Sequence, residues 1–555
     1  MRPCLSDVLE RAAVDSSDVR EAGRTRTLIT AGVALAVAAS FLPVLWNGFV
    51  VWDDDLNLTE NPYFRGFGPA PLRWMFTTFH GGHYQPITWL TFALDYTLWG
   101  MDARGYHLTS LVLHVANALL VYRLIAALVP DASPGSVAIG ALVWAVHPLR
   151  AEVVAWATAR RDVLAGFFYL LTVLTYLHAT RAAVGTGERR RFLAASLAAF
   201  ALSLLSKAQG MTLPAVLLVL DVYPLRRLGS GRAARAALVE KLPYLLVAMA
   251  SAVVAFPASA EAARRSLAQH GLAARAAQAA YGLVFYLWKT VLPAGLSPVY
   301  PLGAGVDPTA LVYVVAMLVA LALTAGLVLL RRRAPWALAA WLCYLAVLAP
   351  VLGFAQAGPQ LVADRYTYLA SVPLATLVTT GLQALRAPAL RRAVGVVLVL
   401  FALATARQVS VWHDSRTLWS HAIRVDPRNY VAYTNRGKVL ELAGDTAGAF
   451  ADYNAAIASY PANFLAHYSR GRLRQAAGDL DGAIEDYSAT IAVQPTYAEA
   501  YNNRGAARVA RNDLVGAADD FAAALRVAPP DWSGRKMVEG NLARVQQALR
   551  GSVAP

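Results

Sequence analysis

Apolar stretches alternate with short polar segments along the first three quarters of the chain. The first stretch, Thr27 to Val50, holds 24 residues without a charged side chain, and a helix needs about 20 residues to cross a bilayer. Further stretches that predict spans lie near 107–129, 136–147, 162–180, 192–206, 210–224, 242–258, 309–330, 335–352, 366–385 and 393–411. The pattern predicts an all-α, polytopic membrane domain of about eleven spans over residues 27–411.

Arginine clusters between the apolar stretches indicate the orientation of the spans. They lie at 189–191, 226–227, 331–333 and 391–392, and such clusters are typical of cytoplasmic loops. With residues 1–26 as a cytoplasmic tail and eleven spans, all four face the cytoplasm if 259–308 stays on the outer side. The apolar piece Tyr281 to Val291 is then a re-entrant or interfacial helix. The loops at 51–105, 148–161 and 353–365, Lys207 and everything after residue 411 face outward.

A repeat with a period of 34 residues begins near residue 413. The period appears in the positions Pro427, Pro461, Pro495 and Pro529, in Gly437, Gly471 and Gly505, and in Tyr453, Tyr487 and Phe521. Small residues at fixed sites let paired helices pack closely, and a proline ends the second helix. The period looks like that of the tetratricopeptide repeat. We expect an α-solenoid over 412–555, with copies at 428–461, 462–495 and 496–529, a half-repeat at 413–427 and a capping helix from Lys536 to Leu549.

The composition limits the classes of protein and partner that the chain can represent. Of the 555 residues 57% are apolar and 15% charged, as in a membrane protein. The net charge of +15 does not indicate a nucleic-acid partner, because many of the arginines sit in the loops between spans. Two cysteines, Cys4 and Cys343, allow no disulfide framework and no cysteine metal site.

Three consecutive carboxylates, Asp53, Asp54 and Asp55, follow the first apolar stretch. They are either a catalytic or cation-binding group at the lipid surface or a solvated charge run that ends a helix. Ionisable and polar residues that the predicted topology brings to the same face are His83, His147, Glu152, Arg160, Arg161, Asp162, Lys207, Gln209, Arg365 and Tyr366. Ionisable residues at membrane depth are functional candidates. The histidines are also compatible with satisfied loop positions, so we expect no metal, and His114 is expected to be a packing residue.

Cations and carboxylates at a membrane surface have a plausible joint chemistry. Arginine and lysine hold phosphate oxygens, and a carboxylate takes the proton of an attacking hydroxyl. The arrangement suits glycosyl transfer from a polyprenyl-phosphate donor, whose tail stays in the bilayer. A lipid transporter and a phosphatase remain open at this point.

Seven segments carry a resemblance to a known family. They are Phe49-Val-Val-Trp-Asp-Asp-Asp, Gln85-Pro-Ile-Thr-Trp-Leu-Thr-Phe, Gly105-Tyr-His-Leu, His147-Pro-Leu-Arg-Ala-Glu, Ala159-Arg-Arg-Asp, Lys207-Ala-Gln-Gly and Ala363-Asp-Arg-Tyr-Thr-Tyr-Leu. Their order, together with the repeats, resembles the transmembrane and tetratricopeptide-repeat-containing (TMTC) proteins. The resemblance implies a GT-C-type glycosyltransferase with its site on the lumenal or periplasmic side. Eukaryotic members resemble O-mannosyltransferases that use dolichyl-phosphate mannose and modify Ser or Thr.

The resemblance also implies roles for the candidate residues. Asp53 or Asp54 is the catalytic base, with Asp54 slightly preferred, and Asp55 supports it. Arg160, Arg161, Lys207 and Arg365 are candidates for the donor phosphate, and the orienting residues are His83, His147, Glu152, Asp162, Gln209 and Tyr366. The third aspartate and the doubled arginine depart from the family pattern.

The expected reaction moves a sugar, most plausibly mannose, from a polyprenyl phosphate to a protein or glycan acceptor, without a cofactor beyond this lipid-linked co-substrate. The repeats recruit the acceptor or a partner protein. Abundant Ala, Arg and Gly indicate a bacterial source, and hence an inner-membrane protein with periplasmic repeats. The rival interpretations are a membrane-anchored scaffold without enzyme activity and a transporter of lipid-linked sugars.

Overall fold

The computed structural model describes residues 5–229, 231–258, 271–303, 305–354, 358, 360–385 and 388–551. Its regular elements in these ranges are helices apart from two short strands, β1 (Tyr300–Pro301) and β2 (Gln360–Val362), which confirms the all-α prediction. The chain divides into two compact units. One comprises Met1–Pro298 with Gly305–Asp414, and the other Val299–Ala304 with Ser415–Pro555.

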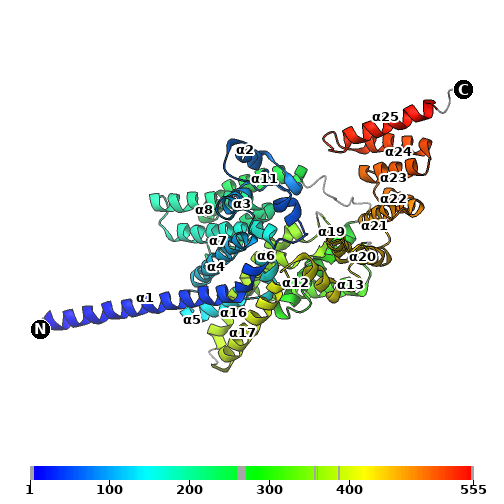
Figure 1. The fold of residues 1–555 in the computed structure, drawn as a ribbon. Helices are drawn as coiled ribbons and strands as arrows, with labels where there is room; N and C mark the ends of the chain where they lie inside the picture. Colours follow the sequence, from blue (N-terminus) through cyan, green and yellow to red (C-terminus); the bar gives the residue numbers. More distant parts are fainter. Residues whose placement is uncertain are drawn as a thin grey trace. The chain divides into compact units, whose positions relative to one another are not determined.

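The first unit is a bundle of helices (Figure 1). Its α-helices are α1 Leu5–Phe41, α2 Pro69–Thr77, α3 Pro86–Trp99, α4 Ala103–Leu128, α5 Pro134–Ala145, α6 Ala151–Ala155, α7 Arg160–Arg181, α8 Gly187–Ser206, α9 Leu213–Val222, α10 Gly231–Val239, α11 Leu242–Ala258, α12 Leu272–Val291, α13 Leu311–Leu329, α14 Pro335–Leu348, α15 Thr367–Ala370, α16 Val372–Leu385 and α17 Pro388–Ser410. Short 3-10 or π turns join some of them: η1 Leu42–Trp46, η2 Asp55–Thr59, η3 His80–Gly82, η4 Pro148–Arg150, η5 Ala157–Ala159, η6 Ala208–Thr212, η7 Leu330–Arg332, η8 Ala349–Val351 and η9 Asp364–Tyr366.

Within the described ranges, six helices are long and apolar enough to cross a membrane. These are Gly23–Trp46, Ala103–Leu128, Ala157–Arg181, Gly231–Ala255, Leu311–Arg332 and Arg391–Ser410, and the bent pair Pro134–Ala145 with Pro148–Ala155 makes up to seven. Shorter apolar helices lie at Ala208–Val222, Pro335–Val351 and Val372–Ala384. The protein is therefore a multi-pass membrane protein. The predicted count of eleven also includes α8, which belongs to neither set.

Three expectations about the helices need correction. The first apolar span ends at Trp46 rather than Val50, because α1 stops at Phe41 and the chain leaves η1 in extended form at Asn47. The predicted short piece from Tyr281 is the second half of α12, a continuous helix of 20 residues. The predicted tail before residue 27 also continues into α1, which starts at Leu5.

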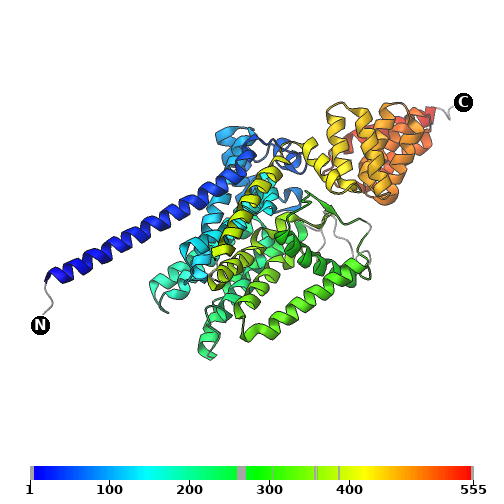
Figure 2. The same cartoon turned by 90° about the horizontal axis from the view of Figure 1, so that it is seen from below.

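Small and hydroxyl-bearing residues let the helices of the first unit approach closely. Helices α7 and α8 lie side by side (Figure 2), and Ser203 Oγ donates to Ala165 O at 2.9 Å between them. A Cβ added to Gly140 on α5 would collide with Thr379 Oγ1 and lie 3.0 Å from Ala375 O on α16. Small residues at helix contacts are typical of membrane proteins.

The second unit is a series of helix pairs. Its helices are α18 Ser415–Val425, α19 Tyr430–Leu442, α20 Thr446–Ser459, α21 Phe464–Ala476, α22 Leu480–Val493, α23 Ala498–Ala510, α24 Leu514–Val527 and α25 Arg535–Gly551. A Cβ added to Gly471 would lie 2.9 Å from the ring of Tyr487, and Gly505 stands in the same relation to Phe521. This close approach explains why glycine and an aromatic residue share the 34-residue period.

An ion-pair ladder runs through the repeats and was not predicted. In each repeat, two N–H groups of an arginine on the first helix donate hydrogen bonds to an aspartate on the second helix. The pairs are Arg436 with Asp452, Arg470 with Asp486 and Arg504 with Asp520. Arg470 Nη1 also donates to Asn454 of the preceding repeat at 2.7 Å. The ladder therefore links successive repeats as well as the two helices within one.

Candidate active site

The segment from Asn47 to Asp55, here called the acidic loop, begins where the first span ends and is hydrogen-bonded to the end of α17 and the residues that follow it. Asn47 Nδ2 donates to Val409 O at 3.0 Å, and Gly48 N donates to His413 O at 2.9 Å. Five residues later Asp53 adopts a left-handed backbone, with φ 66°. That conformation costs a non-glycine residue about 1–2 kcal/mol and persists only where neighbouring contacts fix it.

Asp54 is fully buried, and both of its oxygens are hydrogen-bonded. Oδ1 accepts from Thr158 N at 2.8 Å and from Thr158 Oγ1 at 2.7 Å, while Oδ2 accepts from Val50 N at 3.0 Å. Burial raises the pKa of Asp54 to about 7, although these three hydrogen bonds oppose the shift. Its carboxylate joins the acidic loop to η5 and offers little to a substrate.

Asp53 is only half buried and is surrounded by different groups. Burial raises the pKa of its carboxyl group above the ordinary value, while the charges of Arg161 and Arg365 lower it and that of Asp55 raises it. Asp55 itself starts η2. Asp53 therefore lies close enough to the candidate cations Arg161 and Arg365 for their charges to act on it.

Arg161 is buried, with 7% of its surface exposed. Across the described ranges it has neither an ion pair within 4.0 Å nor a hydrogen bond, and its guanidinium lies 6.0 Å from the ring centroid of Trp156. It lines a cavity of about 140 Å³ together with His83, Gln85 and Lys207. The buried Gln85 Oε1 also has no hydrogen-bond partner in the part of the chain that the structure describes. Two polar groups in this cavity are therefore unsatisfied by the protein.

The other two cations of the site are paired. Lys207 Nζ lies 2.5 Å from Asp162 Oδ1, and burial lowers the pKa of Lys207 to about 8 against the attraction of that carboxylate. Arg365 Nη1 lies 2.6 Å from Glu152 Oε1, and Arg365 N donates to Glu152 Oε2 at 2.8 Å. Gln209 lines a small cavity of about 20 Å³ with Asp162, Lys207 and Arg365.

His83 and Tyr366 lie close to these cations. The side chain of His83 is exposed, yet the charge of Arg161, followed by burial and by Lys207, holds its pKa well below the usual value. Its imidazole is therefore neutral at pH 7. The ring of Tyr366 lies 5.0 Å from the guanidinium of Arg365.

Two predicted site residues lie elsewhere. Arg160 is fully buried, with Nη2 2.8 Å from Asp95 Oδ2 and Nε donating to Ser110 Oγ at 2.9 Å. Adjacent residues of a helix point in different directions, so Arg160 and Arg161 serve different surroundings. His147 uses both ring nitrogens, towards Thr290 O at 3.0 Å and Leu149 N at 3.2 Å. Neither residue contacts the acidic loop through a hydrogen bond or an ion pair.

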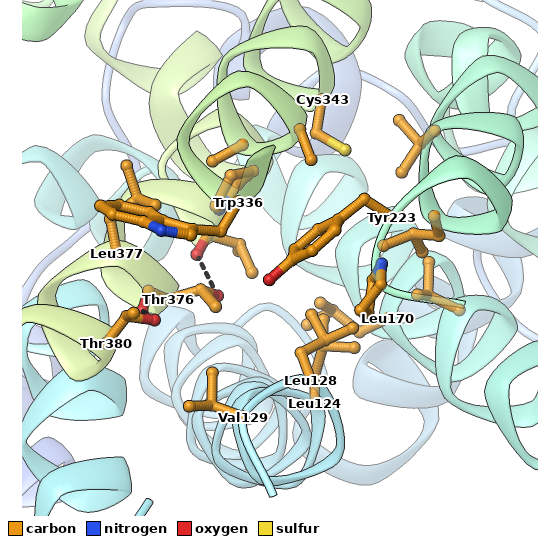
Figure 3. Close-up of a pocket in the computed structure, with 18 of the residues that line it drawn as sticks. Leu124, Leu128, Val129, Leu170, Tyr223, Trp336, Cys343, Thr376, Leu377 and Thr380 are labelled. Carbon is orange, nitrogen blue, oxygen red and sulfur yellow. Dashed lines mark hydrogen bonds between the residues drawn. The ribbon is translucent and has the colours of Figure 1, made fainter. Parts of the chain in front are cut away.

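An apolar cavity of about 360 Å³ lies between α4, α7, α9, α14 and α16 (Figure 3). Trp336 and Cys343 line it, and the ring of Tyr223 projects into it with the hydroxyl towards its middle (Figure 3). Leu369 lines both this cavity and the small cavity beside Lys207. The volume is in the range of lipid- and drug-sized pockets.

Comparison with known proteins gives one matching family profile and several similar proteins. A family profile described as TPR repeat matches residues 471–511. Over 154 residues the chain is 36% identical to Protein O-mannosyl-transferase TMTC2 of Mus musculus, which covers 27% of this chain and 18% of that protein. Over 195 residues it is 32% identical to human Protein O-mannosyl-transferase TMTC1, and the match covers 32% of this chain and 22% of the human protein. The chain is thus similar to TMTC proteins over 27% to 32% of its length and carries tetratricopeptide repeats.

The similarity covers only part of the relatives. The chain spans 18% of the length of the mouse protein and 28% of that of Protein O-mannosyl-transferase F38B6.6 of Caenorhabditis elegans, to which it is 28% identical over 209 residues. The relatives named here are eukaryotic.

Two residues of the site escaped sequence reasoning, and so did Asp95, the partner of Arg160. Trp156 and Thr158 lie in the predicted outer loop 148–161 but carry no charge that would single them out, and Asp95 lies in the loop 51–105, far from Arg160 in sequence. A usable signal existed for Trp156, because an aromatic residue shortly before a pair of arginines is a candidate cation–π partner. His114 is a packing residue as predicted, with Nδ1 2.9 Å from Tyr368 Oη and Nε2 3.0 Å from Ala145 O.

Proposed function

We propose that this TMTC-like chain is a GT-C-type glycosyltransferase that transfers mannose from a polyprenyl-phosphate carrier to a hydroxyl group of a protein acceptor. The observation that supports this most is Arg161, a buried cation that has no ion pair or hydrogen bond among the described residues, lines a cavity and lies near Asp53. The sugar and the acceptor class are proposed from the relatives, which are named protein O-mannosyl-transferases.

The phosphate of the donor would occupy the 140 Å³ cavity. A buried charge without a counter-charge is costly, and a phosphate supplies that charge to Arg161 and acceptor oxygens to its N–H groups. Lys207 on the same cavity adds a second cation. Neutral His83 would contribute a hydrogen bond without adding positive charge.

Asp53 would be the catalytic base, in place of the preferred Asp54, because the oxygens of Asp54 already accept three protein hydrogen bonds. Asp53 takes the proton of the acceptor hydroxyl group while the hydroxyl oxygen forms a bond to the anomeric carbon of the sugar. The bond from that carbon to the phosphate oxygen breaks, and polyprenyl phosphate leaves with the electron pair. A single displacement of this kind inverts the anomeric configuration.

The polyprenyl tail would lie in the 360 Å³ apolar cavity, which shares the lining residue Leu369 with the small cavity beside Lys207. Filling the cavity by Val173→Trp is then expected to raise the KM for the donor. Val253→Trp, at a position 72% exposed, is a control that adds the same side chain outside the cavity. Equal KM values for the two variants would place the tail elsewhere.

The location and the partners also belong to the proposal. The repeats would recruit the acceptor protein, since helix-pair arrays form extended binding surfaces. The arginine clusters favour a cytoplasmic N-terminus, with the site and the repeats on the outer side. For a bacterial source this means the inner membrane and the periplasm.

The test measures mannose release from radiolabelled polyprenyl-phosphate mannose by membranes that hold equal amounts of wild type, Asp53→Asn or Asp54→Asn. Loss of the base is expected to lower transfer about 10²- to 10⁴-fold in Asp53→Asn. Transfer should persist in the presence of a chelator. Wild-type transfer by Asp53→Asn would refute the assignment of the base, and no transfer by wild type would favour the scaffold or transporter.

A further inference from the structure

We propose that Trp156 and Thr158 are positioning residues that hold Asp53 in its left-handed conformation and set the spacing of Arg161 and Arg365. The inference rests on the proposed function, in which Asp53 is the base. It goes further, because neither residue touches the substrate in that proposal and neither is ionisable. The segment that contains them, from the end of α6 through η5, lies in the predicted outer loop 148–161 and carries no charged side chain.

The residues on both sides of Asp53 are fixed by this one segment. Trp156 Nε1 donates to Trp52 O at 2.7 Å, which holds the peptide group before Asp53. Thr158 N and Oγ1 donate to Asp54 Oδ1 at 2.8 and 2.7 Å, which holds the residue after it. Since the backbone angles of a residue are set by its two flanking peptide planes, these contacts help to hold the φ of 66° at Asp53, together with Asn57 N, which donates to Asp53 O at 2.8 Å.

The indole of Trp156 also lies beside both cations. The guanidinium carbon of Arg161 lies 6.0 Å, and that of Arg365 5.6 Å, from its ring centroid. Trp412 stacks on the same residue, with centroids 6.0 Å apart and planes 22° apart, and Trp156 is 1% exposed. Burial, stacking and the hydrogen bond of its Nε1 hold the ring in place, and it attracts both cations through its quadrupole. It therefore fixes Arg161 and Arg365 relative to the acidic loop.

The two residues should leave different kinetic signatures. Thr158 acts on the base through Asp54, so its loss is expected to lower kcat and leave donor binding unchanged. Trp156 acts on the base and on the two cations, so its loss is expected to lower kcat and also to weaken binding of the phosphate. A merely structural role would lower the amount of folded protein without separating kcat from KM.

The experiment uses the full-length protein in detergent, with Thr158→Val, Thr158→Ser and Trp156→Phe. Thr158→Val removes the hydroxyl group at constant size and is expected to lower kcat about 10- to 100-fold, because small misplacements of a catalytic group have effects of this size, with the donor KM unchanged. Thr158→Ser keeps the hydroxyl group and should restore most of kcat. Wild-type kcat in Thr158→Val, or an equal loss in Thr158→Ser, would overturn the role of Thr158. Should Thr158→Val fail to fold, Thr158→Ala removes the same donor without a new methyl group and is judged by the same outcomes.

A binding readout separates Trp156 from the reaction itself. Titration with polyprenyl phosphate, which carries no sugar, is expected to show weaker binding to Trp156→Phe and unchanged binding to Thr158→Val. Unchanged binding to Trp156→Phe would overturn its role in spacing the cations. The Asp53→Asn variant distinguishes the two levels of inference. If Asp53→Asn transfers mannose like wild type, the assignment of Asp53 as the base is refuted. If Asp53→Asn loses transfer while Trp156→Phe and Thr158→Val keep full activity, only the positioning role of Trp156 and Thr158 is refuted.

Discussion

Adjacent arginines at the start of α7 provide a sharp test, because the structure gives them opposite roles. Arg160 and Arg161 are neighbours in sequence, are both buried and carry the same charge. Arg160 is paired with Asp95, whereas Arg161 lines the 140 Å³ cavity without an ion pair in the described ranges. We predict that Arg160→Gln lowers stability and that Arg161→Gln lowers donor affinity.

The magnitudes follow from the contacts. The ion pair of Arg160 with Asp95 has side-chain exposures of 0% and 1%, and removing one partner of a buried pair costs about 3–5 kcal/mol. Removing Arg161 breaks no protein contact of this kind, so the free energy of unfolding should fall little or even rise. The lost charge-assisted hydrogen bond to the phosphate is worth about 1.5–3 kcal/mol, which corresponds to about a 10- to 100-fold increase in the donor Kd.

The assay records thermal unfolding of the detergent-solubilised variants and their titration with polyprenyl phosphate. The control is Asp95→Asn with Arg160→Gln, which removes both charges and should recover part of the stability that either single variant loses. Loss of affinity in Arg160→Gln with normal unfolding, or loss of stability in Arg161→Gln with normal affinity, would refute the assignment. Equal effects of both variants on both readouts would show that the two side chains share one environment.

Other predictions concern pH, the repeats and helix packing. Because burial lowers the pKa of Lys207 to about 8, donor affinity should fall as the pH rises through that value, and Lys207→Arg should remove this loss. In the repeats, burial raises the pKa of Asp486, but hydrogen bonds from the surrounding histidine and arginines outweigh this effect and hold the pKa below the ordinary value. The ionised Asp486 therefore stabilises the folded repeats above about pH 4, and this contribution is lost as the pH falls below that value. Asp486→Asn should lower the opening free energy by about 2 kcal/mol in hydrogen exchange on the full chain, whereas the exposed Asp481→Asn should change it by about 0–1 kcal/mol. Gly140→Ala, which would collide with Thr379, should lower the midpoint of thermal unfolding, and an unchanged midpoint would contradict the close packing of α5 on α16.

The fold was largely predictable because its main signals are local. Apolar length predicts spans, and a repeated glycine and aromatic at 34 residues predict a helix-pair solenoid, which the helices from Tyr430 onward confirm. The end of the first span was placed wrongly, since Asn47, Gly48 and Phe49 continue an uncharged run although the helix has already stopped. Pro43 is a local signal for the end of α1, whereas the contacts of Asn47 with Val409 and of Gly48 with His413 fix the chain beyond it and are not visible in the local sequence.

The site was only partly predictable for the same reason. Sequence order places candidates on one face of the membrane, but it does not say which of Arg160 and Arg161 turns towards that face. Asp95 decides this by pairing with Arg160. Likewise, the run of three aspartates does not show that Asp54 accepts a hydrogen bond from Thr158. Pairing partners distant in sequence determine which charged groups stay available, and they are visible only in the folded chain.

A buried arginine is therefore informative only together with its surroundings, as Arg150 shows. Its side chain is 1% exposed and, among the described residues, it forms no ion pair, much like Arg161. Yet Arg150 lies over the rings of Trp144 and Tyr368, each 5.7 Å from its guanidinium carbon, and donates to Thr367 Oγ1 at 3.0 Å. These groups compensate part of its charge inside the helix bundle. Arg161 combines a single ring, 6.0 Å from its guanidinium carbon, with a cavity and an acid beyond ion-pair range, and this combination is what favours an anionic ligand.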